Sequence, residues 1–262
     1  MPDPPAIEVR GVWKEFVKRG RRVEALQAVD FTVEPNEFAA VLGPSGCGKS
    51  TLLNMVAGFD RPSRGTVRAQ GRPVEGPHPS RGVVFQEPAL FPWYTVLDNI
   101  TFGPRTLGRP AAEYRPRAEA LIEQVGLRGF ESHYPAELSG GMKQRVSLAR
   151  VLVLQPEILL MDEPFGSLDA QTRTLMQELL LSVWERHHQT VLFITHDVEE
   201  ALLLADSVSV MTARPGRIKK RLAVDLPRPR TLELTTSPVF NALKREVLAL
   251  IREESRRAAA EA

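Results

Sequence analysis

Short apolar runs alternate with stretches of helical periodicity along most of this chain. The apolar runs cover residues 38–42, 83–86, 158–161, 191–194 and 208–211. Continuous runs of this length are typical of strands that are buried on both faces of a parallel sheet. Between them, residues 52–56, residues 169–187 and the segment from Val198 repeat apolar side chains at helical spacing. Strands that alternate with helices predict an α/β fold with a mostly parallel sheet.

Two regions depart from this alternation. Residues 7–41 begin with apolar and polar residues in turn, which predicts short strands broken by turns. Residues 96–155 are helical in pattern and interrupt the series of strands. We therefore expect one domain, with a core formed by residues 6–88 and 157–233, a helical insertion at 89–156 and a helical tail at 234–262. The tail is amphipathic, which favours a helix docked on its own core.

Composition and charge limit the possible functions. The chain has 262 residues, with 34 basic and 32 acidic side chains and a formal charge of +2. This balance gives no sign of the basic stripe that nucleic-acid binding requires. The single cysteine, Cys47, cannot form an internal disulfide and fits a reducing compartment. No apolar segment approaches the ~20 residues needed to cross a bilayer, and residues 1–5 do not resemble a signal peptide. We expect a cytosolic protein whose membrane role, if any, requires a partner.

A glycine-rich loop follows the first buried run. Residues 43–50, Gly-Pro-Ser-Gly-Cys-Gly-Lys-Ser, fit the pattern GxxxxGK[ST] between a predicted strand and a predicted helix. The glycines allow backbone amides to surround phosphate oxygens, and the helix adds the positive end of its dipole. Lys49 can reach the β- and γ-phosphates, and the Ser50 hydroxyl can bind Mg²⁺. We expect the Cys47 side chain to point away from the phosphates. This loop by itself predicts a nucleoside triphosphate site and no particular reaction.

A pair of acids ends the run at 158–161. Asp162 and Glu163 lie at the carboxyl end of a predicted strand, where ligand sites of parallel sheets are found. Adjacent strand residues face opposite ways, so we expect different roles for the two acids. Asp162 would hold Mg²⁺ through its water shell, and Glu163 would act as the general base for the attacking water. Pro164 is expected to stop the strand.

The segment Leu138-Ser-Gly-Gly-Met-Lys-Gln-Arg145 narrows the class. Ser139, Gly140 and Gly141 open a helix, so they offer a hydroxyl and free amides to an anion, and glycines permit close backbone approach. The segment resembles the signature sequence of ABC ATPases, commonly written LSGGQ, with Met142 in place of the glutamine. The resemblance covers residues 6–230, and all of the family's motifs occur in order.

This resemblance implies a P-loop NTPase (RecA-like) core with a small antiparallel β part and an inserted helical subdomain. It also implies that two copies bind two ATP molecules, each between the P-loop of one copy and the signature of the other. By the same resemblance Gln86 is the Q-loop residue, Asp169 lies in the D-loop, His196 is the switch histidine and Phe16 stacks on adenine. The expected catalytic residues are Glu163, His196, Gln86 and Lys49, and the expected metal ligands are Ser50, Gln86 and Asp162. The expected ATP contacts are Phe16, Gly43, Pro44, Ser45, Gly46, Cys47, Gly48, Lys49, Ser50, Thr51, Ser139, Gly140, Gly141 and Asp169.

A finer resemblance concerns the role of the cassette. Residues 81–86, 90–93, 95–99, 214–218 and 225–230 resemble those of the nitrate, sulfonate and taurine importer ATPases. Leu90, Phe91 and Trp93 would then form an apolar socket for a permease helix, unless they pack inside the helical block. The resemblance implies an ATP- and Mg²⁺-dependent homodimer at the cytoplasmic face of the membrane. It would work with separate permease subunits and, indirectly, a solute-binding protein that selects a small anion. A role in DNA repair or translation remains the alternative, and co-purification with a permease would discriminate between the two.

Overall fold

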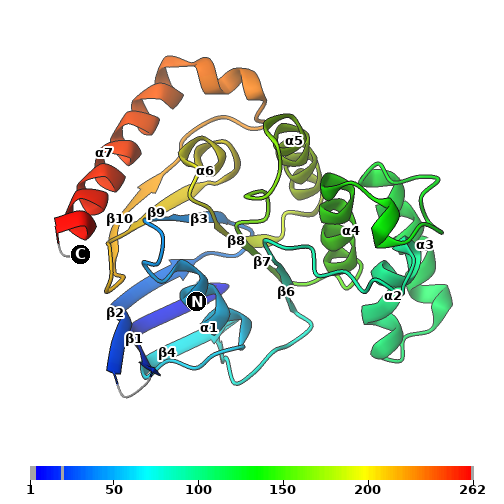
Figure 1. The fold of residues 1–262 in the computed structure, drawn as a ribbon, viewed down its shortest axis with the longest axis horizontal. Coiled ribbons are helices and arrows are strands. Elements are labelled where there is room, and N and C mark those ends of the chain that lie inside the picture. The colour runs from blue at the N-terminus through cyan, green and yellow to red at the C-terminus, as the bar shows by residue number, and fades with distance from the viewer. Residues whose placement is uncertain (1–3, 19–20, 261–262) are drawn as a thin grey trace. The chain divides into compact units, whose positions relative to one another are not determined.

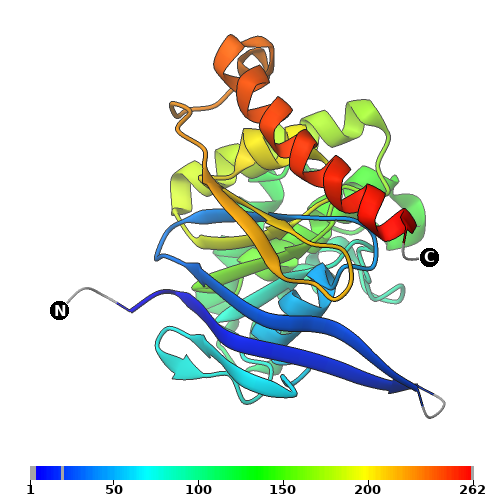
Figure 2. The same ribbon diagram turned by 90° about the vertical axis from the view of Figure 1, so that its left-hand side faces the viewer.

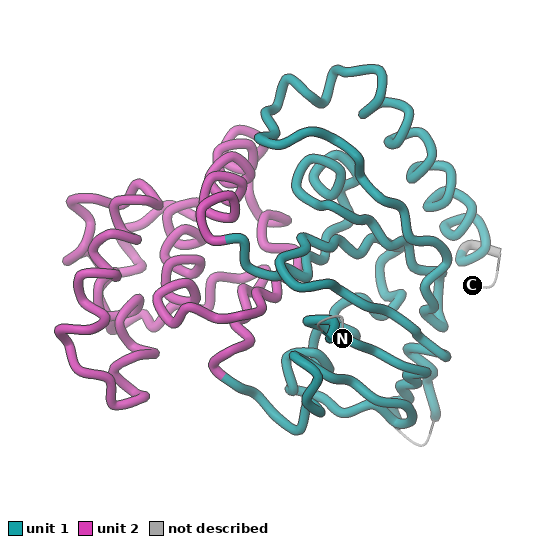
Figure 3. The backbone as a smooth tube through the Cα atoms, turned by 180° about the vertical axis from the view of Figure 1, so that it is seen from behind, with its two compact units in different colours: residues 1–78, 188–262 teal, residues 79–187 magenta. Residues whose placement is uncertain are grey.

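The structure, a computed structural model, describes residues 4–18 and 21–260. It divides into two compact units, of which one comprises residues 1–78 and 188–262 and the other residues 79–187 (Figure 3). The first unit contains the P-loop and the second contains the signature segment. No helix in the described ranges combines the length and apolar character needed to span a membrane.

A largely parallel sheet forms the centre of the first unit (Figure 1). Strands β3 (Phe38–Leu42), β8 (Thr190–Ile194) and β9 (Ser207–Met211) run parallel, and β10 (Ile218–Ala223) joins the edge of β9 in the antiparallel sense. The order in this unit is β10-β9-β3-β8. Every residue of β3, β8 and β9 is buried. Burial on both faces explains why these strands appear in the sequence as continuous apolar runs.

A second, antiparallel sheet belongs to the same unit. Its order is β2-β1-β4-β5, formed by β1 (Ile7–Lys18), β2 (Arg21–Val33), β4 (Arg64–Ala69) and β5 (Arg72–Pro73). Figure 2 shows β1 and β2 as a long hairpin. The expectation of short strands broken by turns was therefore wrong for β1 and β2. Register shifts between Val9 and Glu15, together with a positive φ at Gly11, break the alternation in the sequence without ending the pairing.

The described residues of the first unit also form the helices α1 (Lys49–Ala57), α6 (Val198–Leu204) and α7 (Pro238–Ala260). A short 3₁₀ turn, η2 (Leu232–Thr236), precedes α7. Helix α7 contacts α6 and β9 (Figures 1 and 2). Phe240 and Val247, both fully buried, anchor it. The amphipathic tail is thus a helix docked on its own unit, as expected.

The second unit contains two strands and most of the helices. Strands β6 (Arg81–Val84) and β7 (Ile158–Asp162) are parallel neighbours. The helices are α2 (Val96–Thr106), α3 (Ala111–Gln124), α4 (Gly140–Leu152) and α5 (Ala170–His187), with a 3₁₀ turn, η1 (Pro135–Glu137). Helices α2, α3 and α4 contact one another. The compact unit is wider than residues 89–156, and the division of the chain at those residues remains a prediction.

Two arginines of the segment 225–230 stabilise the first unit. Arg230 is buried and donates to the carbonyls of Leu202, Leu203 and Ala205 at 3.2, 3.2 and 2.7 Å. These carbonyls belong to the end of α6, where the last turn has no helical partners. Burial lowers the pKa of Arg230 to about 10, so the guanidinium stays charged at neutral pH. Arg228 donates to Asp206 at 2.7 Å.

We expect Arg230→Met to lower the free energy of unfolding by about 2–4 kcal/mol, because it leaves buried carbonyls without donors. Urea unfolding followed by circular dichroism measures this. Arg256→Met, on the exposed side of α7, is the matched control and should change stability by less than about 0.5 kcal/mol. Equal stability of the two variants would contradict a capping role for Arg230.

Candidate functional site

The loop between β3 and α1 has the backbone of an anion cradle. Gly46 and Gly48 have φ values of +76° and +104°, which residues other than glycine rarely adopt. A Cβ on Gly48 would also lie 2.6 Å from Cδ2 of Leu26. Gly48, the N-cap of α1, has no side chain with which to cap the helix, and the first turn of α1 contains no acidic residue. The positive end of α1 is therefore directed at the loop without a competing carboxylate.

Lys49 spans this loop. Its side chain is buried, and Nζ donates to the carbonyls of Gly43 at 2.9 Å and Pro44 at 3.3 Å. The ammonium is thus held at the loop, where an arriving phosphate can exchange for these carbonyls. The next residue, Ser50, is exposed.

Cys47 faces the packed side of the loop. Cys47 is fully buried, and a Cβ on Gly43 would lie 2.8 Å from Sγ of Cys47. The thiol therefore fills space beside the glycine, so only the backbone of Cys47 remains as a candidate for contact with phosphate.

Phe16 and His196 are the other predicted residues of the first unit. Phe16 lies on β1 with 42% of its surface exposed, and Nζ of Lys14 lies 4.9 Å from its ring centroid. An exposed ring fits the predicted stacking on adenine. His196 is exposed in the link between β8 and α6. Its backbone is fixed on both sides, because Asp197 caps α6 and donates its N–H to Thr195 Oγ1 at 3.0 Å.

In the second unit the acidic pair lies where strand β7 ends. The strand ends at Asp162, and Glu163 adopts a left-handed backbone with φ +44°. Glu163 therefore lies outside the strand, so strand pleating does not set the directions of the two acids, and the strand ends before it reaches Pro164. The turn at Glu163 sets the direction of its side chain. A non-glycine residue with positive φ is strained, and such strain concentrates at functional sites.

Gln86 and Glu163 approach a common point in this unit. A Cβ on Gly166 would lie 3.3 Å from Nε2 of Gln86 and 3.8 Å from Oε2 of Glu163. Gly166 leaves the space in which the amide and the carboxylate come close. Resemblance to the family suggested a role for each residue, whereas the position of both beside Gly166 is a result of the structure.

Helix α4 holds the segment that follows β6. Gln144, which is 1% exposed, donates to the Phe85 carbonyl at 3.2 Å. Arg150 donates to the carbonyls of Pro88 and Ala89 at 3.1 and 2.9 Å, and burial lowers the pKa of its guanidinium. The sequence did not predict this positioning role. The only available signal was that two long polar side chains lie near the apolar face of a helix.

The signature segment opens α4 as expected. Ser139 is the N-cap and accepts the Met142 N–H at 3.3 Å, and Ser139 and Gly140 are both exposed. Gly141 differs, because a Cβ there would lie 2.4 Å from Cγ2 of Thr172 in the same chain. The absence of a side chain at Gly141 thus makes room for Thr172 of the same chain, while Gly140 has open space around it.

Asp169 is hydrogen-bonded to Thr172 in the first turn of α5. Its carboxylate accepts the Thr172 hydroxyl at 2.6 Å and the Thr172 N–H at 3.0 Å. These hydrogen bonds lower the pKa of Asp169, so the carboxylate is ionised at neutral pH. Thr172 therefore contacts both Gly141 and Asp169.

The residues predicted to hold Mg²⁺ offer suitable chemistry. Ser50, Asp162 and Gln86 supply hydroxyl, carboxylate and amide oxygens, the hard ligands that Mg²⁺ prefers. Mg²⁺ is usually bound through one or two carboxylates together with nucleotide phosphates. The described residues contain no cluster of three His, Cys, Asp or Glu side chains that could hold a metal alone. This donor set fits an ion that arrives with its nucleotide.

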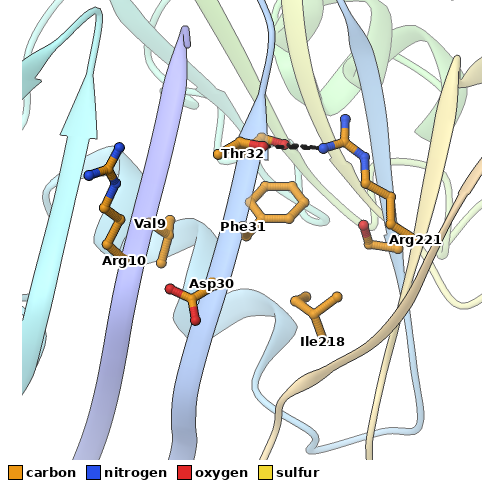
Figure 4. Close-up of a pocket in the computed structure, with 8 residues that line it drawn as sticks. Val9, Arg10, Asp30, Phe31, Thr32, Ile218 and Arg221 are labelled. Carbon is orange, nitrogen blue, oxygen red and sulfur yellow. Dashed lines mark hydrogen bonds between the residues drawn. The ribbon is translucent and has the colours of Figure 1, made fainter. Parts of the chain in front are cut away.

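A pocket of about 400 Å³ lies elsewhere in the first unit (Figure 4). Phe31 of β2 and Ile218 of β10 line it, together with Arg221. Arg221 already donates to the Thr32 carbonyl at 2.9 Å and to Glu37 at 2.5 Å. None of the residues predicted to bind ATP lines this pocket. Its other arginine, Arg10, is paired with Glu8, so neither arginine gives a reason to expect an anion.

Structural comparison places the fold among solved ABC cassettes. The dimeric structure of a bacterial ABC transporter cassette matches with a TM-score of 0.75 and 30% identity, over 84% of this chain and 100% of that one. A post-hydrolysis state of the same kind of cassette, bound to ADP and Pi, matches with a TM-score of 0.73 and 28% identity, over 84% and 100% of the two chains.

Sequence comparison gives the family. Residues 26–166 match the family model described as ABC transporter. An aliphatic sulfonates import ATP-binding protein of Bacillus licheniformis is 47% identical over 93% of each chain. A taurine import ATP-binding protein of Jannaschia sp. is 44% identical over 94% of this chain and 93% of its own, and a nitrate import ATP-binding protein of Synechocystis sp. is 43% identical over 94% and 95%. The chain therefore belongs to the ABC transporter family and is an ABC-type ATPase.

Proposed function

We propose that this chain is the ATP-binding subunit of an importer and drives uptake of a small anionic solute through a separate permease. The relatives named for sulfonates, taurine and nitrate support this proposal, because all three named solutes carry an anionic oxygen-rich group. In this role the protein is a peripheral subunit on the cytoplasmic face of the membrane. A solute-binding protein and the permease would select the solute.

Two copies of the chain would form the ATP sites. Exposure of Ser139 and Gly140 at the N-terminus of α4 carries this part of the proposal, because their hydroxyl and amides are open to an anion. Each ATP would be bound by the P-loop of one copy and by this helix end of the other. The dimeric cassette among the structural relatives supports the arrangement.

The proposed chemistry is hydrolysis of the terminal phosphate. Phe16 stacks on adenine, and the amides of residues 43–51 together with Lys49 hold the phosphates. Ser50, Asp162 and Gln86 would hold Mg²⁺, which would supply positive charge against the phosphates. Glu163 accepts the proton of the attacking water, and His196 contacts the γ-phosphate. Asp169 lies at the interface between the copies.

We expect Glu163→Gln to bind MgATP with unchanged affinity and to lose hydrolysis by about 10²–10⁴-fold, the usual contribution of a general base. The amide keeps the size of the side chain and cannot accept the proton. Steady-state phosphate release and ATP titration measure the two effects. Glu178→Gln, on the exposed side of α5, is the control and should leave both unchanged. Turnover near the wild-type rate would remove Glu163 from the role of base.

An aromatic cluster after β6 is the proposed permease contact. The Phe91 ring lies 4.6 Å from Phe102 and 5.7 Å from Trp93, and 66% of Trp93 is exposed. The fully buried Asn99 fixes the backbone beneath the cluster, through hydrogen bonds to both the N–H and the carbonyl of Phe91 at 2.9 and 3.1 Å. A large exposed aromatic ring on a fixed backbone is typical of an interface anchor.

We expect Trp93→Ala to weaken co-purification with the permease by at least about tenfold, because an exposed interface tryptophan contributes about 2 kcal/mol or more. Its melting temperature and ATP affinity should stay at the wild-type values, since the ring is mostly exposed. Val239→Ala, at another exposed apolar side chain, is the control. If the permease binds both variants equally, the aromatic cluster is not its contact.

The solute is tested with the intact complex of cassette, permease and solute-binding protein in vesicles. Nitrate, an alkanesulfonate and taurine, added one at a time, should differ in their stimulation of ATP hydrolysis. Stimulation by DNA or ribosomes, with no response to any solute, would favour a role outside transport.

A further inference from the structure

The loop at 212–217, between β9 and β10, belongs to a segment that the sequence singled out and that the proposed chemistry does not use. The loop contacts the P-loop within the first unit. Nε and one terminal nitrogen of Arg214 both donate to the carbonyl oxygen of Gly46, at 3.2 and 3.0 Å. A guanidinium 168 positions away in the sequence thus holds the backbone of the P-loop.

The loop is itself fixed from two sides. Gly216 donates its N–H to the Ala25 carbonyl at 2.9 Å and accepts the Gln27 N–H at 3.0 Å, which attaches the loop to β2. A Cβ on Gly216 would lie only 2.0 Å from the carbonyl oxygen of Cys47, so only glycine allows this approach to the P-loop. The Arg214 side chain therefore extends from a backbone that has little freedom to move.

The C-terminal helix holds the residue before Arg214. Glu254 of α7 is 1% exposed, and its Oε2 accepts the Ala213 N–H at 3.0 Å. Its Oε1 accepts Nζ of Lys219 on β10 at 2.5 Å. A buried carboxylate of α7 is thus joined to the loop that reaches the P-loop.

The hydrogen bonds at Gly46 constrain the peptide group that joins Gly46 to Cys47 in the P-loop. Gly46 has a φ of +76° and no side chain to limit its rotation. In a planar trans peptide the carbonyl and the next N–H point in opposite directions. When Arg214 fixes the Gly46 carbonyl, it fixes the Cys47 N–H on the other side. In this structure that N–H donates to the Pro44 carbonyl at 3.3 Å, within the loop.

We infer that Arg214 is a positioning residue that holds the P-loop ready for ATP, and that Glu254 of α7 supports it. Two donors of a rigid guanidinium on one oxygen set an orientation that a lysine ammonium does not reproduce. Preorganised amides bind phosphate without first losing conformational freedom. ATP binding and docking of the last turns of α7 are therefore coupled. The inference rests on ATP binding at the P-loop and is independent of the importer role.

The first test measures the dissociation constant of MgATP by calorimetry on the full chain. We expect Arg214→Ala to raise this constant about tenfold, which corresponds to about 1.4 kcal/mol. The kcat at saturating ATP should change by less than about threefold, because the loop holds the phosphates in both ground and transition states. Arg217→Ala is the matched control, since its guanidinium, in the same loop, donates to Gln27 instead. Its constant should stay within about twofold of wild type.

Arg214→Lys separates charge from geometry. It keeps the positive charge without the two-donor fork, and we expect it to bind MgATP nearly as weakly as Arg214→Ala. Wild-type affinity in Arg214→Ala would overturn the inference, and wild-type affinity in Arg214→Lys would replace positioning with simple charge attraction. Equal losses in the Arg214→Ala and Arg217→Ala variants would also overturn it. Failure of the wild-type chain to bind MgATP would instead refute the ATP site itself.

The second test measures hydrogen exchange in α7. Because coupling is reciprocal, saturating MgATP should slow amide exchange around Glu254 in the wild-type chain and leave it unchanged in Arg214→Ala. Glu254→Gln should weaken MgATP binding in the same direction as Arg214→Ala. Lys220→Ala, which removes a different ion pair between β10 and α7, should not. Equal protection of α7 in wild type and Arg214→Ala would overturn the coupling.

Discussion

The ATP site depends on peptide N–H groups that must point inward around a phosphate with no side chain to hold them there. Glycine supplies the required positive φ at positions 46 and 48, but the same freedom allows the loop to rotate away. The surrounding structure restricts it. Leu26 packs against Gly48, Gly216 lies against the Cys47 carbonyl, and Arg214 holds the Gly46 carbonyl. Neighbouring residues of the first unit therefore fix the backbone conformation of the P-loop.

In the second unit, too, an exposed helix N-terminus is combined with hydrogen bonds that hold a neighbouring backbone segment. The exposed N-terminus of this helix offers Ser139 and Gly140, while its buried side chains organise the unit behind them. Gln144 and Arg150 hold the backbone that carries Gln86 into place. Each unit thus presents a helix end suited to an anion. In the first unit a distant arginine holds the loop before the helix, whereas in the second unit side chains of the helix hold the segment that carries Gln86. The proposed two-copy ATP site would require both exposed helix ends and backbone segments that are held in place.

Much of the fold could be predicted because burial leaves a direct trace in the sequence. Strands β3, β8 and β9 are buried on both faces and appear as unbroken apolar runs. The places of the glycine-rich loop before α1 and of the signature segment at the start of α4 were also predictable, because short motifs of glycine and hydroxyl residues mark such helix starts. The lengths of β1 and β2 were not, because bulges around Gly11 interrupt the alternation that marks a strand.

The sequence by itself determined the family, the α/β class and the residue types that could touch ATP, because those choices follow from local periodicity and short motifs. Only the tertiary structure decided which distant groups support them. The turn at Glu163 depends on one backbone angle. The position of Gln86 and Glu163 beside Gly166 and the hydrogen bonds from Arg214 to Gly46 bring together residues that are far apart in the sequence. A hydrogen bond across 168 positions leaves no periodic trace, since it is fixed by how the strands and loops pack.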